Sequence, residues 1–172
     1  MEKVNAVGKE LTEIERAYCA GFLDADGAIM ACIEKHGAKK FGYRIRVSVK
    51  VTQKDANTAQ WFLSKFLVGR IKTNRFGTDR GNFEWEVKDQ KHAAEVLKIL
   101  LPFLRIKKRQ ALIALEILSF PILIQDDLMR AARLADEIAS FNVRSKLRRK
   151  NFASSIQFLP PLTTESRTSG RR

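Results

Sequence analysis

Two aspartates, Asp24 and Asp26, lie on either side of Ala25 and directly before Gly27. Carboxylate oxygens are the ligands that hard divalent cations such as Mg²⁺ prefer, and such ions assist phosphodiester hydrolysis. A single Asp-x-Asp-Gly is ordinarily only the turn that ends a helix, so the spacing alone does not define a metal site. At a helix end, however, carboxylates have the wrong sign for the helix dipole, which favours a cation beside them.

A stripe of small residues marks the segment before these acids. The residues recur at helical spacing, with Ala20 beside them: Ala17, Gly21 and Ala25. The helix would begin near Thr12, because Thr12 and Glu15 match a capping box. We expect the opposite face of this helix to carry Ile14, Tyr18 and Phe22. A glycine inside a helix costs roughly 1 kcal/mol relative to alanine, so we expect the close approach of a second helix, from the same chain or another copy, to offset that cost.

The charge of the chain indicates a polyanionic partner. Its 172 residues include 32 Lys and Arg against 19 Asp and Glu, a formal net charge of +13. Basic residues are grouped in segments 39–54, 105–109 and 144–150, which is typical of a nucleic-acid-binding surface. No apolar stretch reaches the ~18 residues of a membrane span, and the chain starts without an apolar leader, so we expect neither a membrane protein nor a secreted one. Two cysteines, Cys19 and Cys32, cannot form a disulfide framework.

Apolar periodicity predicts an α+β fold in the order αββαββα, followed by further helices. The first helix should run from Thr12 to the stop at 24–27, and Gly69 should end the second. The remaining elements are expected as strands at 28–34, 43–53, 70–76 and 83–88, and as helices at 55–67, 90–101, 108–119, 126–141 and 144–157. The length suits one domain over residues 1–158, with a basic tail at 159–172 whose composition is that of a disordered segment.

One face of the two predicted hairpins is polar in a way that suits DNA reading. Along 43–53 the outward positions carry no acid, being Arg44, Arg46, Ser48, Lys50 and Thr52. The second hairpin adds outward residues of both charges, namely Arg70, Lys72, Asn74, Glu84 and Glu86. A β-ribbon can lie in the major groove, where Arg and Lys donate to guanine, Asn pairs with adenine and Glu accepts from cytosine. The mixture favours base reading over phosphate binding alone.

Residues 18–29, YCAGFLDADGAI, resemble the signature helix of the LAGLIDADG homing endonucleases. The similarity extends over about residues 12–150 and includes the blocks VTQK at 51–54, WFL at 61–63 and PFLRIKKRQA at 102–111. The motif occurs once, as in the homodimeric single-motif branch of that family. The resemblance implies a LAGLIDADG-type fold whose antiparallel sheet forms a DNA-binding saddle, with further C-terminal helices. One departure is an insertion of about two residues between Gln53 and Trp61.

The resemblance also implies a cleavage centre and a dimer interface. Asp26 would bind a divalent metal together with the backbone carbonyl of Ala25, while Gln53 and Lys107 would position water and the scissile phosphate. Asp24 would either support this site or act as a structural cap. Two copies of the motif helix would pack across the dimer axis through Ala17, Ala20, Gly21 and Asp24. The expected metal is Mg²⁺, with Mn²⁺ also active and Ca²⁺ bound without cleavage.

Further DNA contacts follow from the same resemblance. On the first strand the outward residues of the family correspond to Met30, Cys32, Glu34 and His36. Asn142 matches a family asparagine beside the phosphate-contacting segment 144–150, which includes Arg144 and Lys146.

Together these features predict a homodimeric, Mg²⁺-dependent endonuclease that makes a double-strand break in a long pseudo-palindromic DNA target. An RNA maturase, with intron RNA as its partner, and a non-cleaving DNA-binding regulator are alternatives with the same fold. A ribosome-associated protein would need neither the small-residue stripe nor the pair of aspartates. An intron-encoded protein of this kind would act in intron homing where it is translated, in a prokaryotic cytoplasm or in a chloroplast or mitochondrion.

Overall fold

The computed structural model describes residues 7–74, 77, 81–142 and 152–158. Five α-helices, four strands and one short 3-10 helix occur in these residues. In chain order they are α1 (Glu13–Asp26), β1 (Gly27–Lys35), β2 (Tyr43–Gln53), α2 (Ala56–Phe66), β3 (Arg70–Asn74), β4 (Asn82–Val87), α3 (Gln90–Leu100), α4 (Lys108–Ser119), α5 (Gln125–Phe141) and the 3-10 helix Ala153–Ser155. The predicted α+β fold and its αββαββα order are confirmed.

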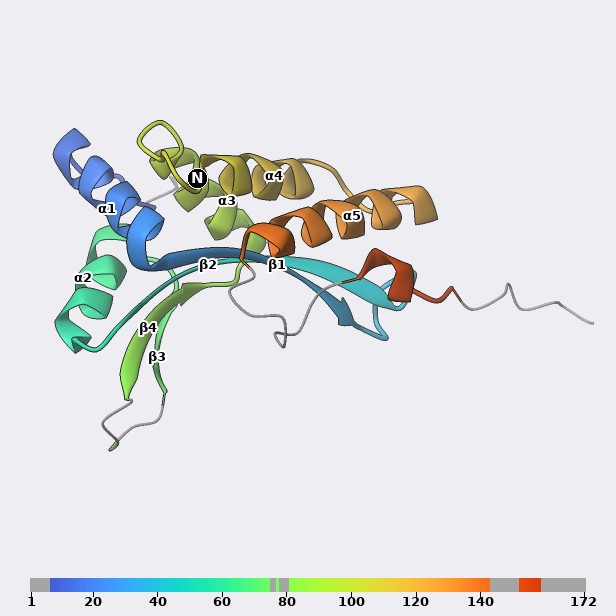
Figure 1. The fold of residues 1–172 in the computed structure, drawn as a ribbon, viewed down its shortest axis with the longest axis horizontal. Helices are drawn as coiled ribbons and strands as arrows, with labels where there is room; N and C mark the ends of the chain where they lie inside the picture. The colour runs from blue at the N-terminus through green and yellow to red at the C-terminus, as the bar shows by residue number, and fades with distance from the viewer. Residues whose placement is uncertain (1–6, 75–76, 78–80, 143–151, 159–172) are drawn as a thin grey trace, which may run out of the picture.

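The four strands form one antiparallel sheet in the order β1-β2-β4-β3. The sheet is strongly curved, with helices stacked over one face and no described helix on the opposite face (Figure 1). Helices α4 and α5 lie over the β1–β2 half, while α2 packs at the β3–β4 end. Among the described residues, the helices therefore cover only one face of the curved sheet.

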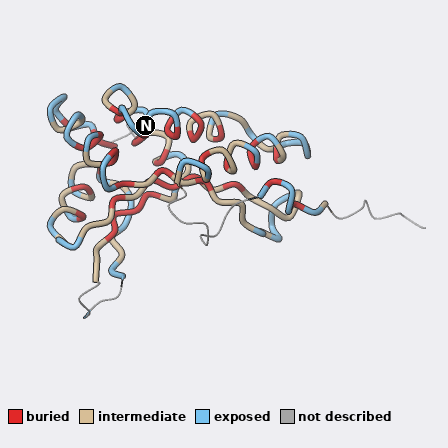
Figure 2. Tube along the Cα trace, in the orientation of Figure 1, coloured by how far each residue is buried: buried red, intermediate tan, exposed pale blue. Residues whose placement is uncertain are grey.

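Apolar side chains between the sheet and the helices form the core. Figure 2 marks the buried positions in red along the backbone. Alternate strand residues such as Val47, Val49 and Trp85 point into it and are fully buried. Trp85 packs on two phenylalanines of α2, with ring centroids 5.1 Å from Phe62 and 5.2 Å from Phe66. The period-2 pattern of the strands thus fixes which face is buried and which face remains polar.

Helix α1 begins at the predicted capping box. The Glu15 amide donates to the Thr12 hydroxyl at 3.2 Å, and the Thr12 amide donates to the Glu15 carboxylate at 2.9 Å. Hydrogen bonds from Lys65 and then from Thr12 lower the pKa of Glu15 to about 2. Because Lys65 belongs to α2, the same carboxylate that caps α1 also ties it to α2.

The C-terminal prediction differs from the structure. Residues 143–151, which include most of the expected helix at 144–157, lie outside the described residues. In the part that is described, residues 153–155 form only a single 3-10 turn, whose start is held by a hydrogen bond from the Ala153 amide to Asp136 of α5. Among the described helices, none combines the length and the apolar character needed to cross a bilayer.

Helix α2 ends where the sequence predicted, but Gly69 is not the residue that ends it. The helix ends at Leu67, which adopts a left-handed conformation with φ of 58°, and Gly69 begins the turn into β3 with φ of +93°. A Cβ on Gly69 would lie 2.8 Å from the Trp85 indole nitrogen and 2.9 Å from the Glu86 carbonyl oxygen. Gly69 is therefore required by the close approach of β4 rather than by the helix end.

We expect Gly69→Ala to destabilise the protein by about 1–3 kcal/mol, because the side chain would meet both an unfavourable φ and the buried Trp85. Urea denaturation followed by tryptophan fluorescence measures this loss. Gly37→Ala is the matched control, since no atom lies within 4 Å of its Cβ position, and we expect a change below about 0.5 kcal/mol. Equal stability of the two variants would contradict the proposed role of Gly69.

Candidate cleavage centre and nucleic-acid interface

The exposed Asp26 forms the last residue of α1, where the chain turns into β1. The Gln53 side-chain amide, at the end of β2, donates a 2.8 Å hydrogen bond to the Asp26 carboxylate. The pairing of Gly27 with Val51 in the β1–β2 register brings these two residues together. Two predicted site residues that are distant in sequence therefore meet at the edge of the sheet.

Lys107 is held at the same turn by Asp24. The Lys107 ammonium donates to the Asp24 carbonyl oxygen, and the Asp24 carboxylate accepts hydrogen bonds from backbone amides of the segment before α4. Asp24 and Lys107 are only 8% and 9% exposed. The Asp24 side chain therefore joins the end of α1 to the segment before α4 within one subunit.

The donors at this turn fit a hard divalent cation, although one chain does not complete a site. Asp26 and Ala25 are both exposed residues in the last turn of α1. The last carbonyl groups of a helix have no partner within it, so they can accept from or bind to other groups. Among the described residues, no group of three or more Asp, Glu, His or Cys side chains is arranged to hold a metal. Oxygen donors from a second copy, from phosphate groups or from water would have to complete the coordination.

The exposed face of α1 differs from the expected arrangement. Ala17 and Gly21 are exposed as predicted, and a Cβ on Gly21 would meet nothing within 4 Å. Ile14 and Tyr18, expected on the opposite face, share this exposed face, at 82% and 57% exposed. That expectation was wrong because residues at i, i+3, i+4 and i+7 lie on one side of a helix.

Two of the four residues predicted for the dimer interface are buried within the chain itself. Ala20 is completely buried, and Asp24 is occupied by the segment before α4. The part of the predicted interface that is available for a second copy therefore consists of Ala17 and Gly21.

The predicted DNA-reading side chains of the strands share the sheet face on which no described helix lies. The strand register aligns Met30 with Ser48, Cys32 with Arg46 and Glu34 with Arg44. It also aligns the residues of the second hairpin with β2, in the rows Lys50–Glu86–Arg70 and Thr52–Glu84–Lys72, and pairs Asn74 with Asn82 at the far end. Apart from Met30 and Cys32, the residues of these rows are polar or charged, and His36 lies in the turn after β1.

Carboxylates are embedded among the basic residues of this face. Glu84 accepts from Lys50 at 2.9 Å, and Glu86 forms ion pairs with Lys72 at 2.6 Å and Lys88 at 2.9 Å. Glu34 pairs in the same way with Arg44 and Arg46. Glu84 and Glu86 are only 6% and 5% exposed, because the cations cover them. Two outward-pointing acids are therefore buried beneath basic side chains rather than open to a base.

The ionisation of Glu86 depends on these neighbours. Burial is the largest single influence and would raise its pKa, but the hydrogen bonds and charges of Lys72 and Lys88 together lower the pKa below the usual 4.5. The carboxylate therefore stays ionised at neutral pH. Its ion pairs stabilise the fold above the usual pKa, and this contribution is lost as the pH falls through the lowered value.

Asn142 was expected to contact DNA, but its side chain forms hydrogen bonds within the subunit. Its side-chain NH₂ donates to the carbonyl oxygen of Ile29 at 2.7 Å, and its oxygen accepts from Gln110 at 3.2 Å. These bonds join the end of α5 to β1 and α4. The predicted phosphate-contacting residues Arg144 and Lys146 lie outside the described residues.

Sequence reasoning missed two polar residues that shape this surface. Lys88 follows β4 and adds a third cation around Glu86. Gln90 hydrogen-bonds to both the amide and the carbonyl of Val47, at 3.0 and 2.9 Å, and so continues the pairing of β2 beyond the end of β4. The signal available in the sequence was the position of Gln90, a polar residue directly after Asp89, which caps α3.

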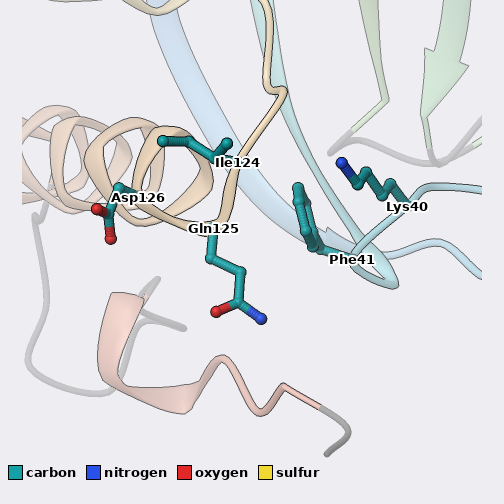
Figure 3. Close-up of a pocket in the computed structure, with 5 residues that line it drawn as sticks. All are labelled: Lys40, Phe41, Ile124, Gln125 and Asp126. Carbon is teal, nitrogen blue, oxygen red and sulfur yellow. The ribbon is translucent and has the colours of Figure 1, made fainter. Parts of the chain in front are cut away.

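A surface pocket lies away from the cleavage centre. It is formed by Lys40 and Phe41 from the β1–β2 turn and by residues 124–126 at the start of α5 (Figure 3). The Lys40 ammonium donates to the Leu123 carbonyl oxygen at 2.9 Å and so ties the turn to α5. None of the residues predicted for cleavage lines this pocket.

Solved structures with the same fold include endonucleases bound to DNA. Two structures of I-CvuI, one bound to the I-CreI target with 2 mM Mg and uncleaved DNA and the other to its own target with 2 mM Ca, match with TM-scores of 0.73 and 0.72. Each alignment has 28% identity and covers 83% of this chain and 90% of I-CvuI. The fold therefore places this chain among proteins with the structure of these endonucleases.

Sequence comparison gives the family. Residues 19–115 match the model of the LAGLIDADG endonucleases. DNA endonuclease I-CreI of Chlamydomonas reinhardtii is 31% identical over 156 residues, which cover 88% of this chain and 93% of I-CreI. DNA endonuclease I-CvuI of Chlorella vulgaris is 34% identical over 132 residues, which cover 73% of this chain and 78% of I-CvuI. The chain belongs to the LAGLIDADG endonuclease family, in its single-motif branch, and is a DNA endonuclease, as the resemblance implied.

Proposed function

We propose that two copies of this chain bind a long pseudo-palindromic DNA site and cut both strands near its centre. The observation that carries this proposal is the meeting of Asp26, Gln53 and the Asp24-bound Lys107 at the end of a helix whose exposed face is built from small and apolar residues. Pairing two such helices through Ala17 and Gly21 would bring two copies of Asp26 together. Each subunit would then contribute one half of the cleavage centre.

Asp26 and the Ala25 carbonyl are the groups that would hold a divalent cation. Mg²⁺ is the cation we assign, with Mn²⁺ as an active substitute and Ca²⁺ as a ligand that binds without supporting cleavage; the presence of Mg and Ca in the I-CvuI structures supports a divalent ion. When bound, such an ion activates water and stabilises negative charge on phosphate oxygens. The donors that the chain offers here are a carboxylate and a backbone carbonyl, and oxygen is the ligand atom that a hard cation prefers.

The protein's own side chains would orient the reactants. Gln53 fixes one oxygen of Asp26 by donating to it, which leaves the other oxygen to face the ligand. The ammonium of Lys107 would add positive charge where the scissile phosphate develops negative charge. No covalent intermediate with the protein is needed, because water is the nucleophile.

The polar sheet face is the surface that would read the DNA half-site. Arg44, Arg46 and Lys50 lie on β2, and Arg70 and Lys72 lie on β3, with β4 between the two strands. Each of these basic side chains already contacts a carboxylate of the same face. We infer that these carboxylates hold the basic side chains in fixed positions. DNA contacts would then depend on base identity and not only on charge.

We expect Glu86→Gln to weaken discrimination while strengthening non-specific binding. Arg70, Lys72 and Lys88 would lose the anion that they share and become available to phosphates. The slope of log K against log salt should steepen by about 0.9 for each additional phosphate neutralised. Fluorescence anisotropy with a target duplex and a random duplex over a salt series measures both effects.

Glu116→Gln is the matched control for this variant. Glu116 pairs with Arg130 on the outer helices, so its replacement makes the same charge change away from the sheet face. Identical salt slopes for the two variants would show that only net charge matters.

Incubation of the protein with a plasmid library and Mg²⁺, followed by sequencing of the ends, tests the proposed function. We expect double-strand breaks at one long, nearly two-fold symmetric sequence and a dimer on gel filtration. Binding to RNA or DNA without breaks would instead favour a maturase or a regulator. We further propose that the protein acts where it is translated, in a prokaryotic cytoplasm or a DNA-containing organelle. Its DNA target would be the site at which the intron that encodes it is inserted, in the form without the intron.

A further inference from the structure

The segment before α4 is organised by one carboxylate from α1. The Asp24 side chain accepts from the backbone amides of Arg105, Ile106 and Lys107 at 2.8, 3.1 and 2.8 Å. Residues 81 to 83 positions apart in the chain are thereby joined. Three consecutive backbone amides thus converge on one buried carboxylate, an arrangement that binds an anion and fixes the local backbone.

The contact between Asp24 and Lys107 is reciprocal. The Asp24 carboxylate binds the Lys107 amide, and the Asp24 carbonyl oxygen accepts from the Lys107 ammonium. Helix α1 has no basic residue in its own last turn, so Lys107 supplies the positive charge that the helix dipole favours there. Lys107 also immediately precedes α4, and its side chain does not cap that helix. Its ammonium is directed to α1 instead.

We propose that Asp24 is a positioning residue for cleavage, which fixes the backbone of residues 105–107 and thereby holds Lys107 at a set distance from Asp26. Because Asp24 and Asp26 belong to the same helical turn, a rigid link to Asp24 is also a rigid link to Asp26. This inference rests on the proposed function of Asp26 and Lys107. A displacement of about 1 Å at such a group can reduce a rate by on the order of 100-fold.

Asp24→Asn tests the proposal with little change of shape. The asparagine keeps one acceptor oxygen, but its NH₂ would face a backbone amide, so the three-amide geometry is lost. Asp127→Asn is the matched control, since Asp127 binds the Leu123 and Ile124 amides at 2.9 Å in a loop remote from α1. Both variants remove a carboxylate that ties down consecutive backbone amides.

Two measurements separate positioning from general stability. Hydrogen exchange of the free protein, without metal or DNA, should show faster exchange at residues 105–107 in Asp24→Asn and at 123–124 in Asp127→Asn. Single-turnover cleavage should then slow by on the order of 100-fold only in Asp24→Asn, with target binding in Ca²⁺ unchanged. Asp24→Glu, which keeps the charge but moves it, should give a slow rate as well.

Several results would overturn this inference without affecting the proposed function. One is a wild-type cleavage rate in Asp24→Asn despite faster exchange at residues 105–107. Another is unchanged exchange at those residues, and a third is an equal loss of rate in Asp127→Asn. Failure of the proposed function is recognised separately, by cleavage that survives in Asp26→Asn.

Discussion

Replacement of Asp26 by asparagine is expected to abolish DNA cleavage and to leave DNA binding intact. The asparagine oxygen can still accept from Gln53, so the end of α1 should keep its structure. What is lost is the negative charge that would hold a divalent cation against the scissile phosphate. A loss of several kcal/mol of transition-state stabilisation corresponds to a rate reduced by roughly 1,000-fold or more. Single-turnover cleavage in Mg²⁺ and anisotropy binding in Ca²⁺ measure the two properties.

Asp126→Asn is the control for this experiment. Asp126 is exposed in the first turn of α5, so the variant makes the same chemical change at the opposite end of the molecule (Figure 1). Its cleavage rate should equal that of the unaltered protein. Nicking by Asp26→Asn within tenfold of the unaltered rate would remove Asp26 from the proposed cleavage centre.

Gly21→Leu should produce a stable subunit that neither dimerises nor makes double-strand breaks. No atom lies within 4 Å of the Gly21 Cβ position, so the subunit can accept a side chain there. Replacing a helical glycine by leucine should improve helix stability by up to roughly 1 kcal/mol. Two α1 helices in contact through Ala17 and Gly21, in contrast, would be forced apart by the added side chain. Subunit stability and assembly are thus expected to change in opposite directions.

Sedimentation of Gly21→Leu, together with thermal denaturation, distinguishes these effects. Arg133→Leu adds the same exposed leucine to α5, far from α1, and should remain a dimer. If Gly21→Leu also sediments as a dimer and cleaves normally, the two subunits do not meet through this face of α1.

Local patterns in the sequence were sufficient for much of the fold. The capping box at Thr12, the alternation along residues 43–53 and the turn at Gly27 each involve neighbours in the chain, so the elements could be located without tertiary information. The role of Gly69 was less predictable, because the atoms that a side chain there would meet belong to Trp85 and Glu86 on another strand. The candidate cleavage residues were found through their resemblance to a family, since neither Gln53 nor Lys107 is unusual by itself.

The sequence by itself determined the order of elements, the polar face of the sheet and the motif that ends in Asp26. Only the tertiary structure decided which residues are partners. It placed Glu84 and Glu86 beneath basic side chains, turned Ala20 into the core, and bound Asp24 to the amides of 105–107. The physical reason is that periodicity tells which way a side chain points, whereas strand register and helix packing determine what it meets there.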